Sequence, residues 1–105
     1  FLSISGVPVH DFTFLGFLPH KKGRQTIFNE IAESSTPVIL YESPHRILKT
    51  LESLRDTSPT AHIVVGRELT KMYEEVRSGS ASELLVHFSN HEPKGEFVVL
   101  VDPRK

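Results

Sequence analysis

Residues 38–54 join a short, wholly apolar run to an amphipathic helix, and this junction restricts the fold more than any other stretch of the chain. Residues 38–41 read Val-Ile-Leu-Tyr, which is typical of a strand covered on both faces. Ser43 suits the N-cap of a helix and Pro44 its first position. An apolar stripe at helical spacing follows, formed by Ile47, Leu48, Leu51 and Leu54. A strand that leads at once into such a helix predicts an α/β domain.

The same alternation extends along most of the chain. Further strands are predicted at residues 12–19, 61–65, 74–78 and 96–102. Two further helices are predicted from the apolar stripes Ile27, Phe28, Ile31, Ala32 and Ala81, Leu84, Leu85, Phe88, the second ending at Asn90. This order predicts an α/β fold with a mixed five-stranded sheet and helices on its faces. Its core is expected to contain Phe12, Phe14, Phe17, Phe28, Phe88 and Phe97.

Size and composition indicate one globular domain, since 38% of the 105 residues are hydrophobic and 24% are charged. Residues 1–11 follow no period and are predicted to be a linker from a missing N-terminal domain, which makes residues 12–105 a C-terminal domain. The lack of cysteine excludes thiol catalysis and zinc-thiolate sites and fits a cytoplasmic location. No apolar run approaches the ~20 residues of a membrane span. With a net charge of -1, contact with nucleic acid must come from local basic clusters.

Three charged loops follow predicted strands, where open α/β sheets bind their ligands. In the loop at 42–46, His45 and Arg46 are predicted to lie in the first turn of a helix, where positive charge opposes the helix dipole. Free N–H groups together with these cations would grip a phosphate or carboxylate. Pairing of Arg46 with Glu42 is an equally good interpretation, and both can hold at once.

The other two loops are less specific. Arg67, Glu68 and Lys71 either hold substrate or form a solvated ion-pair loop, and charge alone favours the second. The turn at 20–24, with Lys21, Lys22 and Arg24, offers non-specific affinity for a polyanion or is simply solvated. The pair His87 and His91 lacks a third placed ligand, so no metal site is predicted. No glycine-rich phosphate loop or hydrolase elbow occurs, and spacing alone indicates an anion-binding α/β domain.

Five strings of residues, in order along nearly the whole chain, carry a family resemblance. They are Ser5-Gly-Val-Pro8, Phe14-Leu-Gly-Phe-Leu-Pro19 with Lys21-Lys-Gly23, Tyr41-Glu-Ser-Pro-His-Arg46, Arg67-Glu-Leu-Thr-Lys71 and Glu92-Pro-Lys-Gly-Glu-Phe97. Together they resemble the C-terminal domain of the ribosomal RNA small subunit methyltransferase I family, within the tetrapyrrole methylase superfamily. The resemblance implies a two-domain enzyme that transfers a methyl group from S-adenosylmethionine to the ribose 2′-oxygen of a cytidine in small-subunit ribosomal RNA.

The resemblance also implies roles for particular residues. The cofactor would lie between the two domains, near Tyr41, Glu42, Leu69, Gly95, Glu96 and Phe97. The RNA or substrate surface would be formed by Lys21, Lys22, Arg24, His45, Arg46, Arg67 and Lys71. A base must accept the hydroxyl proton, and the candidates are Glu42, Glu68 and Lys71, or a group of the missing domain.

Other functions fit part of the pattern. A second member of the same fold could act on a tetrapyrrole or another small molecule, although the basic loops favour RNA. A non-catalytic module that binds RNA or a partner is a third hypothesis. The implied partners are small-subunit ribosomal RNA, the chain's own N-terminal domain and a second copy in a homodimer. The 105 residues alone are expected to be inactive, because half of the cofactor site would be absent.

Overall fold

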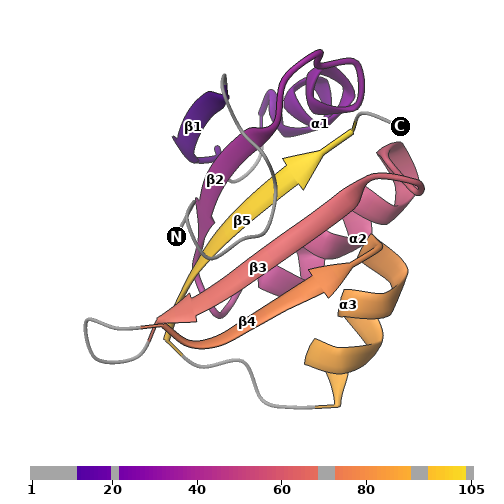
Figure 1. The fold of residues 1–105 in the computed structure, drawn as a ribbon. Helices are drawn as coiled ribbons and strands as arrows, with labels where there is room; N and C mark the ends of the chain where they lie inside the picture. The colour runs from indigo at the N-terminus through magenta and orange to yellow at the C-terminus, as the bar shows by residue number, and fades with distance from the viewer. Residues whose placement is uncertain (1–11, 20–21, 69–72, 91–94, 104–105) are drawn as a thin grey trace.

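The computed structural model describes residues 12–19, 22–68, 73–90 and 95–103. Eight helices and strands follow one another in the order expected from the sequence (Figure 1). They are β1 (Thr13–Phe17), α1 (Arg24–Ala32), β2 (Val38–Glu42), α2 (Ile47–Thr57), β3 (His62–Glu68), β4 (Tyr73–Gly79), α3 (Ala81–Ser89) and β5 (Glu96–Asp102). The predicted last strand is confirmed at both ends, and so is the end of α3, whose C-cap is Asn90.

The sheet is mixed and has the strand order β1-β2-β5-β3-β4, as predicted for an α/β fold. Strand β1 is parallel to β2, whereas β5 is antiparallel to both of its neighbours, β2 and β3. Because β2 and β3 both oppose β5, they run in the same direction. The carboxyl ends of β1, β2 and β3 therefore meet the start of β5 at one edge of the sheet, which we call the carboxyl edge.

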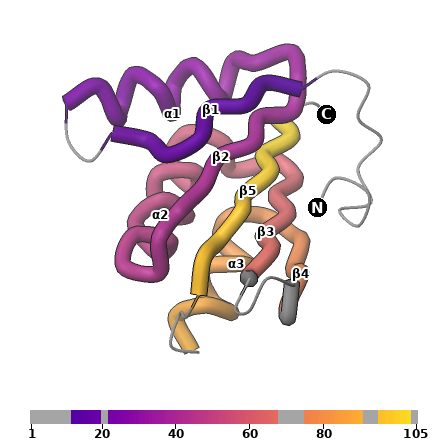
Figure 2. The backbone as a smooth tube through the Cα atoms, turned by 90° about the vertical axis from the view of Figure 1, so that its left-hand side faces the viewer, coloured from indigo at the N-terminus to yellow at the C-terminus, as the bar shows by residue number. Residues whose placement is uncertain are grey.

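All three helices pack on one face of the sheet (Figures 1 and 2). The crossovers β1-α1-β2, β2-α2-β3 and β4-α3-β5 each join parallel strands, and right-handed connections put all three on the same side. A large apolar core lies between the helices and alternate strand residues. Its largest fully buried side chains include Phe28, Ile31, Leu40, Leu51, Leu54, Ile63 and Phe97.

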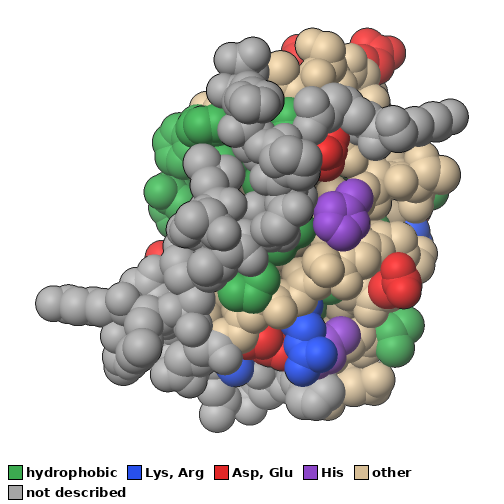
Figure 3. All heavy atoms as spheres, in the orientation of Figure 1, with side chains coloured by type: hydrophobic (Ala, Val, Ile, Leu, Met, Phe, Trp, Pro, Cys, Tyr) green, Lys and Arg blue, Asp and Glu red, His purple; other side chains and the backbone are tan. Residues whose placement is uncertain are grey.

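The opposite face, which we call the open face, carries a smaller buried cluster of Ile39, Val64 and Leu100. Hydrophobic side chains also gather on the surface over β1 and β2 (Figure 3). Phe14 and Phe17 are 56% and 62% exposed, and each ring contacts Tyr41, with centroids 5.3 and 5.4 Å apart.

The expectation that all six aromatic residues lie in the core is therefore wrong for three of them. Phe28, Phe88 and Phe97 are buried, but Phe12, Phe14 and Phe17 are exposed. The reason is position, since β1 is an edge strand with a single neighbour. An irregularity between Phe14 and Gly16 shifts its register against β2, and Gly16 has a φ of 67° there.

The start of α2 also differs from the expectation. Ser43 is not its N-cap and Pro44 is not its first residue, because the regular helix begins at Ile47 with Arg46 in the cap position. The Ser43 carbonyl accepts hydrogen bonds from the N–H groups of Arg46 and Ile47, which makes a separate turn before the helix. The Ser43 N–H donates to Glu42. This turn directs Arg46 back toward the end of β2.

No helix in the described ranges is long and apolar enough to cross a membrane.

Candidate functional site

Two groups of charged side chains lie at the carboxyl edge, on the helix-covered side of the sheet. The register places Phe97 of β5 opposite Glu42 of β2 on one side and Arg67 of β3 on the other. Directly opposed residues point to the same face, and Phe97 belongs to the main core. Neighbouring strands lie about 4.8 Å apart, so the backbones of Glu42 and Arg67 are separated by about 10 Å.

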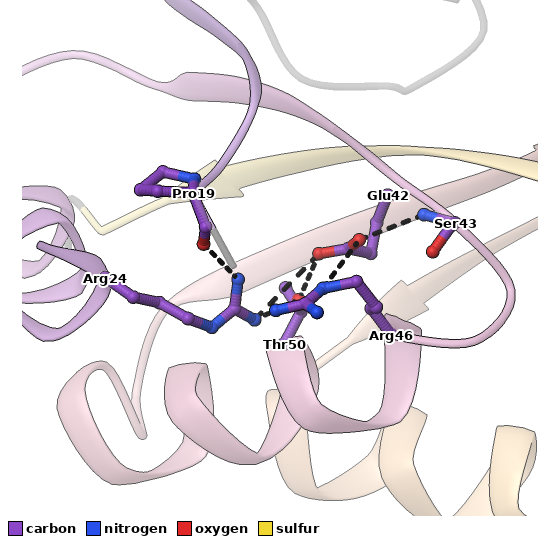
Figure 4. Close-up of polar contacts among 6 residues, drawn as sticks. All are labelled: Pro19, Arg24, Glu42, Ser43, Arg46 and Thr50. Atoms are coloured by element: carbon purple, nitrogen blue, oxygen red, sulfur yellow. Dashed lines mark hydrogen bonds and ion pairs between the residues drawn. The ribbon is translucent and has the colours of Figure 1, made fainter. Parts of the chain in front are cut away.

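The first group surrounds Glu42, whose side chain is only 4% exposed (Figure 4). The Ser43 N–H donates to its Oε1 at 3.0 Å, and the Thr50 hydroxyl donates to Oε2. Arg24 Nη2 and Arg46 Nε each lie 3.9 Å from a carboxylate oxygen. Every polar atom of this buried carboxylate therefore has a partner, as burial of a charge requires.

Arg24 links this group to the rest of the edge. Its Nη2 donates to the Thr50 hydroxyl at 2.8 Å, and its Nη1 donates to the Pro19 carbonyl at 3.3 Å, just beyond β1. The guanidinium also lies over the Phe28 ring, 5.0 Å from its centroid. Burial lowers the pKa of Arg24, Glu42 opposes this effect, and Arg46 adds to it. An arginine remains charged despite such a shift, because its ordinary pKa lies far above the neutral range.

The second group surrounds Glu75 of β4. Its carboxylate lies 3.3 Å from Arg67 Nε on β3, 2.8 Å from Arg77 Nε on β4 and 2.8 Å from His87 Nε2 on α3. Burial opposes ionisation of Glu75, but hydrogen bonds from Arg77 and His87 and the charge of Arg67 lower its pKa overall. One carboxylate again holds two guanidinium groups, as Glu42 does.

The open face at the same edge has a different character. Tyr41 and Val98 are opposed in the register and lie on this face. Tyr41 is 37% exposed, and Glu96 is exposed at the start of β5. Gly95 precedes it with a φ of 77°, a conformation that favours glycine. Aromatic, carboxylate and backbone groups are thus available on the open face, whereas Glu42 and Phe97 point into the opposite side.

The family model described as "Tetrapyrrole (Corrin/Porphyrin) Methylases" matches residues 2–85. This chain belongs to the tetrapyrrole methylase family. It is 41% identical over 103 residues to a protein of Erythrobacter litoralis named "Ribosomal RNA small subunit methyltransferase I", covering 97% of this chain and 37% of that protein. A protein of the same name from Thermotoga maritima is 31% identical over 104 residues, covering 99% of this chain and 47% of that protein.

A solved structure shares the fold of this tetrapyrrole methylase chain. The methyltransferase CobJ has a TM-score of 0.64 to it at 20% sequence identity, covering 95% of this chain and 44% of CobJ. The chain thus spans less than half the length of these relatives.

The tetrapyrrole methylase fold brings some of the predicted site residues together and separates others. Arg24, Glu42 and Arg46 meet in one group, while Arg67 lies in the other. Lys22 and His45 are exposed in turns that flank the first group. Lys21, Leu69, Lys71 and His91 lie outside the described residues, and Glu68 is described as the last residue of β3 without its side chain. Both interpretations of Arg46 remain open, since it pairs with Glu42 and occupies the N-cap position of α2, just before the helix rather than in its first turn.

Three residues of these groups were not singled out from the sequence. Thr50 is typical of a helix, and Glu75 and Arg77 are typical of an exposed strand. His87 was considered only as one of a pair of possible metal ligands with His91. The alternation of Glu75 and Arg77 on one face of β4 was the available signal, but nothing local identifies His87 as their neighbour.

Proposed function

We propose that this chain forms part of an S-adenosylmethionine-dependent methyltransferase that methylates the ribose 2′-oxygen of a cytidine in small-subunit ribosomal RNA. One observation carries the proposal. Relatives named "Ribosomal RNA small subunit methyltransferase I" are 31% to 41% identical to the chain over nearly all of its length. We propose that such an enzyme meets its ribosomal substrate in the cytoplasm, and that an N-terminal domain of the full-length protein completes its active site.

The open face at the carboxyl edge suits the cofactor. S-adenosylmethionine supplies an electrophilic methyl group when bound. Its adenine ring matches an exposed aromatic surface such as Tyr41, and the Glu96 carboxylate has the charge that its sulfonium favours. Gly95 leaves backbone groups accessible, and Leu69 is proposed as a further contact. Glu42 and Phe97 would contribute through their backbone only, because their side chains are buried on the other side.

Glu42 is better suited to hold arginine side chains than to act as the catalytic base. One N–H donor, one O–H donor and two guanidinium groups already occupy its carboxylate oxygens. A 4% exposed carboxylate with all these partners has little room to meet a ribose hydroxyl. The proposed base is therefore Glu68, Lys71 or a group elsewhere in the full-length protein.

The arginine side chains at the carboxyl edge favour the binding of an anionic substrate. Around Glu42, the guanidinium groups of Arg24 and Arg46 lie beside one carboxylate. Arg46 lies at the N-cap of α2, where N–H groups add to its attraction for a phosphate. We place Arg24, His45, Arg46, Arg67 and the lysine-containing turn at 20–24, with Lys71, on the RNA-facing surface.

The test is methyl transfer from labelled S-adenosylmethionine to small ribosomal subunits by the full-length protein and its Arg46→Ala variant. Arg55→Ala is the matched control, because Arg55 is exposed on α2 and also pairs with a carboxylate, that of Asp56. We expect label on one cytidine ribose, with kcat/KM lowered about 10-fold or more by Arg46→Ala and unchanged by Arg55→Ala.

Other outcomes of the methyl-transfer assay would indicate a different site or a different function. Label on one cytidine ribose that persists in Arg46→Ala would keep the function and discard Arg46 as a substrate contact. Binding of subunits without transfer would indicate a non-catalytic RNA module. Transfer to a tetrapyrrole and not to subunits would indicate a small-molecule methyltransferase.

A further inference from the structure

We propose that Arg67, Arg77 and His87, gathered around Glu75, form a second phosphate-binding site that holds the backbone of the RNA away from the reacting ribose. The inference rests on the proposed function for the identity of the polyanion. It adds Arg77 and His87, on β4 and α3, to the surface at the carboxyl edge.

More basic side chains contact Glu75 than a structural ion pair requires. The guanidinium groups of Arg67 and Arg77 contact this one carboxylate, and the His87 ring contacts it as well. A purely structural ion pair on an edge strand needs one cation for one anion. The contact that Arg77 adds is exposed on its side, and an exposed ion pair contributes little to folding.

The geometry leaves donors for a ligand. Arg77 is 54% exposed and contacts Glu75 through Nε. Within the described part of the chain, its two terminal amino groups make no hydrogen bond or ion pair. Those groups form the planar fork that binds phosphate oxygens in pairs. Glu75 thus acts as a positioning residue, because it anchors the inner nitrogen and leaves the outer ones directed to solvent.

The same arrangement occurs twice along the carboxyl edge, which argues against chance. Glu42 holds Arg24 and Arg46, and Glu75 holds Arg67 and Arg77, with Phe97 between the two groups in the strand register. Basic, acidic and histidine side chains lie together low on the surface in Figure 3, in the region that β4 occupies in Figure 1. Two cationic groups on one edge match a chain of successive phosphates better than a single small anion.

The state of Glu75 supports this role. Its lowered pKa keeps the carboxylate ionised throughout the neutral range, so that its hold on both arginines persists there. Burial works against this ionisation, and the contacts with Arg77, His87 and Arg67 overcome it.

The experiment measures binding of the full-length protein to an oligouridylate of about twelve nucleotides across a salt series. Arg77→Ala is expected to weaken binding roughly threefold or more and to lower the slope of log affinity against log salt by about 0.7. Arg77→Lys keeps the charge but loses the planar fork, so its affinity for oligouridylate should lie between those of the wild type and Arg77→Ala. The control Arg55→Ala removes an exposed, carboxylate-paired arginine from α2 and should leave both quantities unchanged.

Thermal unfolding and S-adenosylmethionine binding, which should be unchanged in Arg77→Ala, confirm that the variant is folded. If Arg77→Ala lowers the unfolding temperature, the binding measurements are made with Arg77→Gln instead. Equal affinity and salt slope for the Arg77 and Arg55 variants would overturn the proposal, even where the wild type methylates small subunits. A selective loss of oligouridylate affinity would support it, even where subunits are not methylated and the proposed function fails.

Discussion

At the scale of single residues, the carboxyl edge is organised by two carboxylates rather than by its many cations. Glu42 and Glu75 come from different strands, and each holds one arginine near it in the sequence and one farther away. A long arginine side chain loses about 2 kcal/mol of rotamer freedom when it is held in place. A carboxylate that holds it in advance lowers the entropy lost when a ligand binds.

Thr50 is the residue on which the Glu42 group depends most for its hydrogen bonds. Its hydroxyl is fully buried, donates to Glu42 and accepts from Arg24. We expect Thr50→Val to lower the free energy of unfolding by about 1–3 kcal/mol, because the similar shape leaves both charged partners short of one hydrogen bond. Urea unfolding measures this change.

The control for that experiment is Thr26→Val on the exposed side of α1. It makes the same chemical change on a helix but should alter stability by no more than about 0.5 kcal/mol. A similar small effect for Thr50→Val would show that the buried network contributes nothing to folding.

At the scale of elements, α3 owes its start to a capping box. The Glu83 N–H donates to the Ser80 hydroxyl at 3.2 Å, and the Ser80 N–H donates to the Glu83 carboxylate at 2.9 Å. The hydrogen bonds from the backbone and side chain of Ser80 lower the pKa of Glu83 below its ordinary 4.5. This box fixes the first turn of the helix that carries His87 to Glu75.

The capping box predicts a pH-dependent stability. Because the pKa of Glu83 is lower in the folded state, its contribution is fully present above the unfolded value of about 4.5 and is lost as the pH falls through the folded value. Glu83→Ala should therefore destabilise the protein more at about pH 7 than at about pH 3, as measured by thermal unfolding. Ser82→Ala replaces an uncharged residue at the preceding position, so its effect on stability should not differ between the two pH values. Equal destabilisation by Glu83→Ala at both pH values would contradict the role of the carboxylate.

The two edge strands of the sheet differ in how they meet solvent. Strand β4 carries Glu75 and Arg77, and charged residues on an edge discourage pairing with another sheet. Strand β1 instead exposes Phe14 and Phe17. A patch of exposed aromatic residues on an edge strand is typical of a surface that other protein segments cover.

At the scale of the whole molecule, the chain spans less than half the length of its relatives. The open face carries groups suited to a cofactor, but a cleft needs a second wall. We therefore expect the 105 residues alone to transfer no methyl group to small subunits and to bind S-adenosylmethionine at least about 100-fold more weakly than the full-length protein does.

Isothermal titration of both proteins with S-adenosylmethionine, beside the labelled transfer assay, measures the difference. Circular dichroism of the short chain serves as the control for folding. Measurable transfer by the 105 residues alone would show that the described part contains a complete catalytic site.

The sequence by itself determined the order of the helices and strands and the bounds of some of them, such as β5 and the end of α3. Strand β3 instead continues to Glu68, through residues that were predicted to lie in a loop. Local rules suffice for the confirmed bounds, since the apolar stripe of α3 and the alternation of β5 depend on residues a few positions apart. The strings that carry the family resemblance are local as well. The interpretation of Arg46 as a partner of Glu42 was also within reach, because the two residues are four positions apart.

Only the tertiary structure decided which strands are neighbours and which face of the sheet the helices cover. It placed β5 between β2 and β3, which brings Glu42 and Arg67 to either side of Phe97. It also put all three helices on one face of the sheet. Phe14 and Phe17 lie on the opposite face and remain exposed, although aromatic residues in a strand suggested a core. The contact of His87 with Glu75 joins a helix to a strand twelve positions earlier, and no local pattern encodes it. Such pairings follow from packing the whole sheet against its helices, because the free energy of burial is shared by segments far apart in the chain.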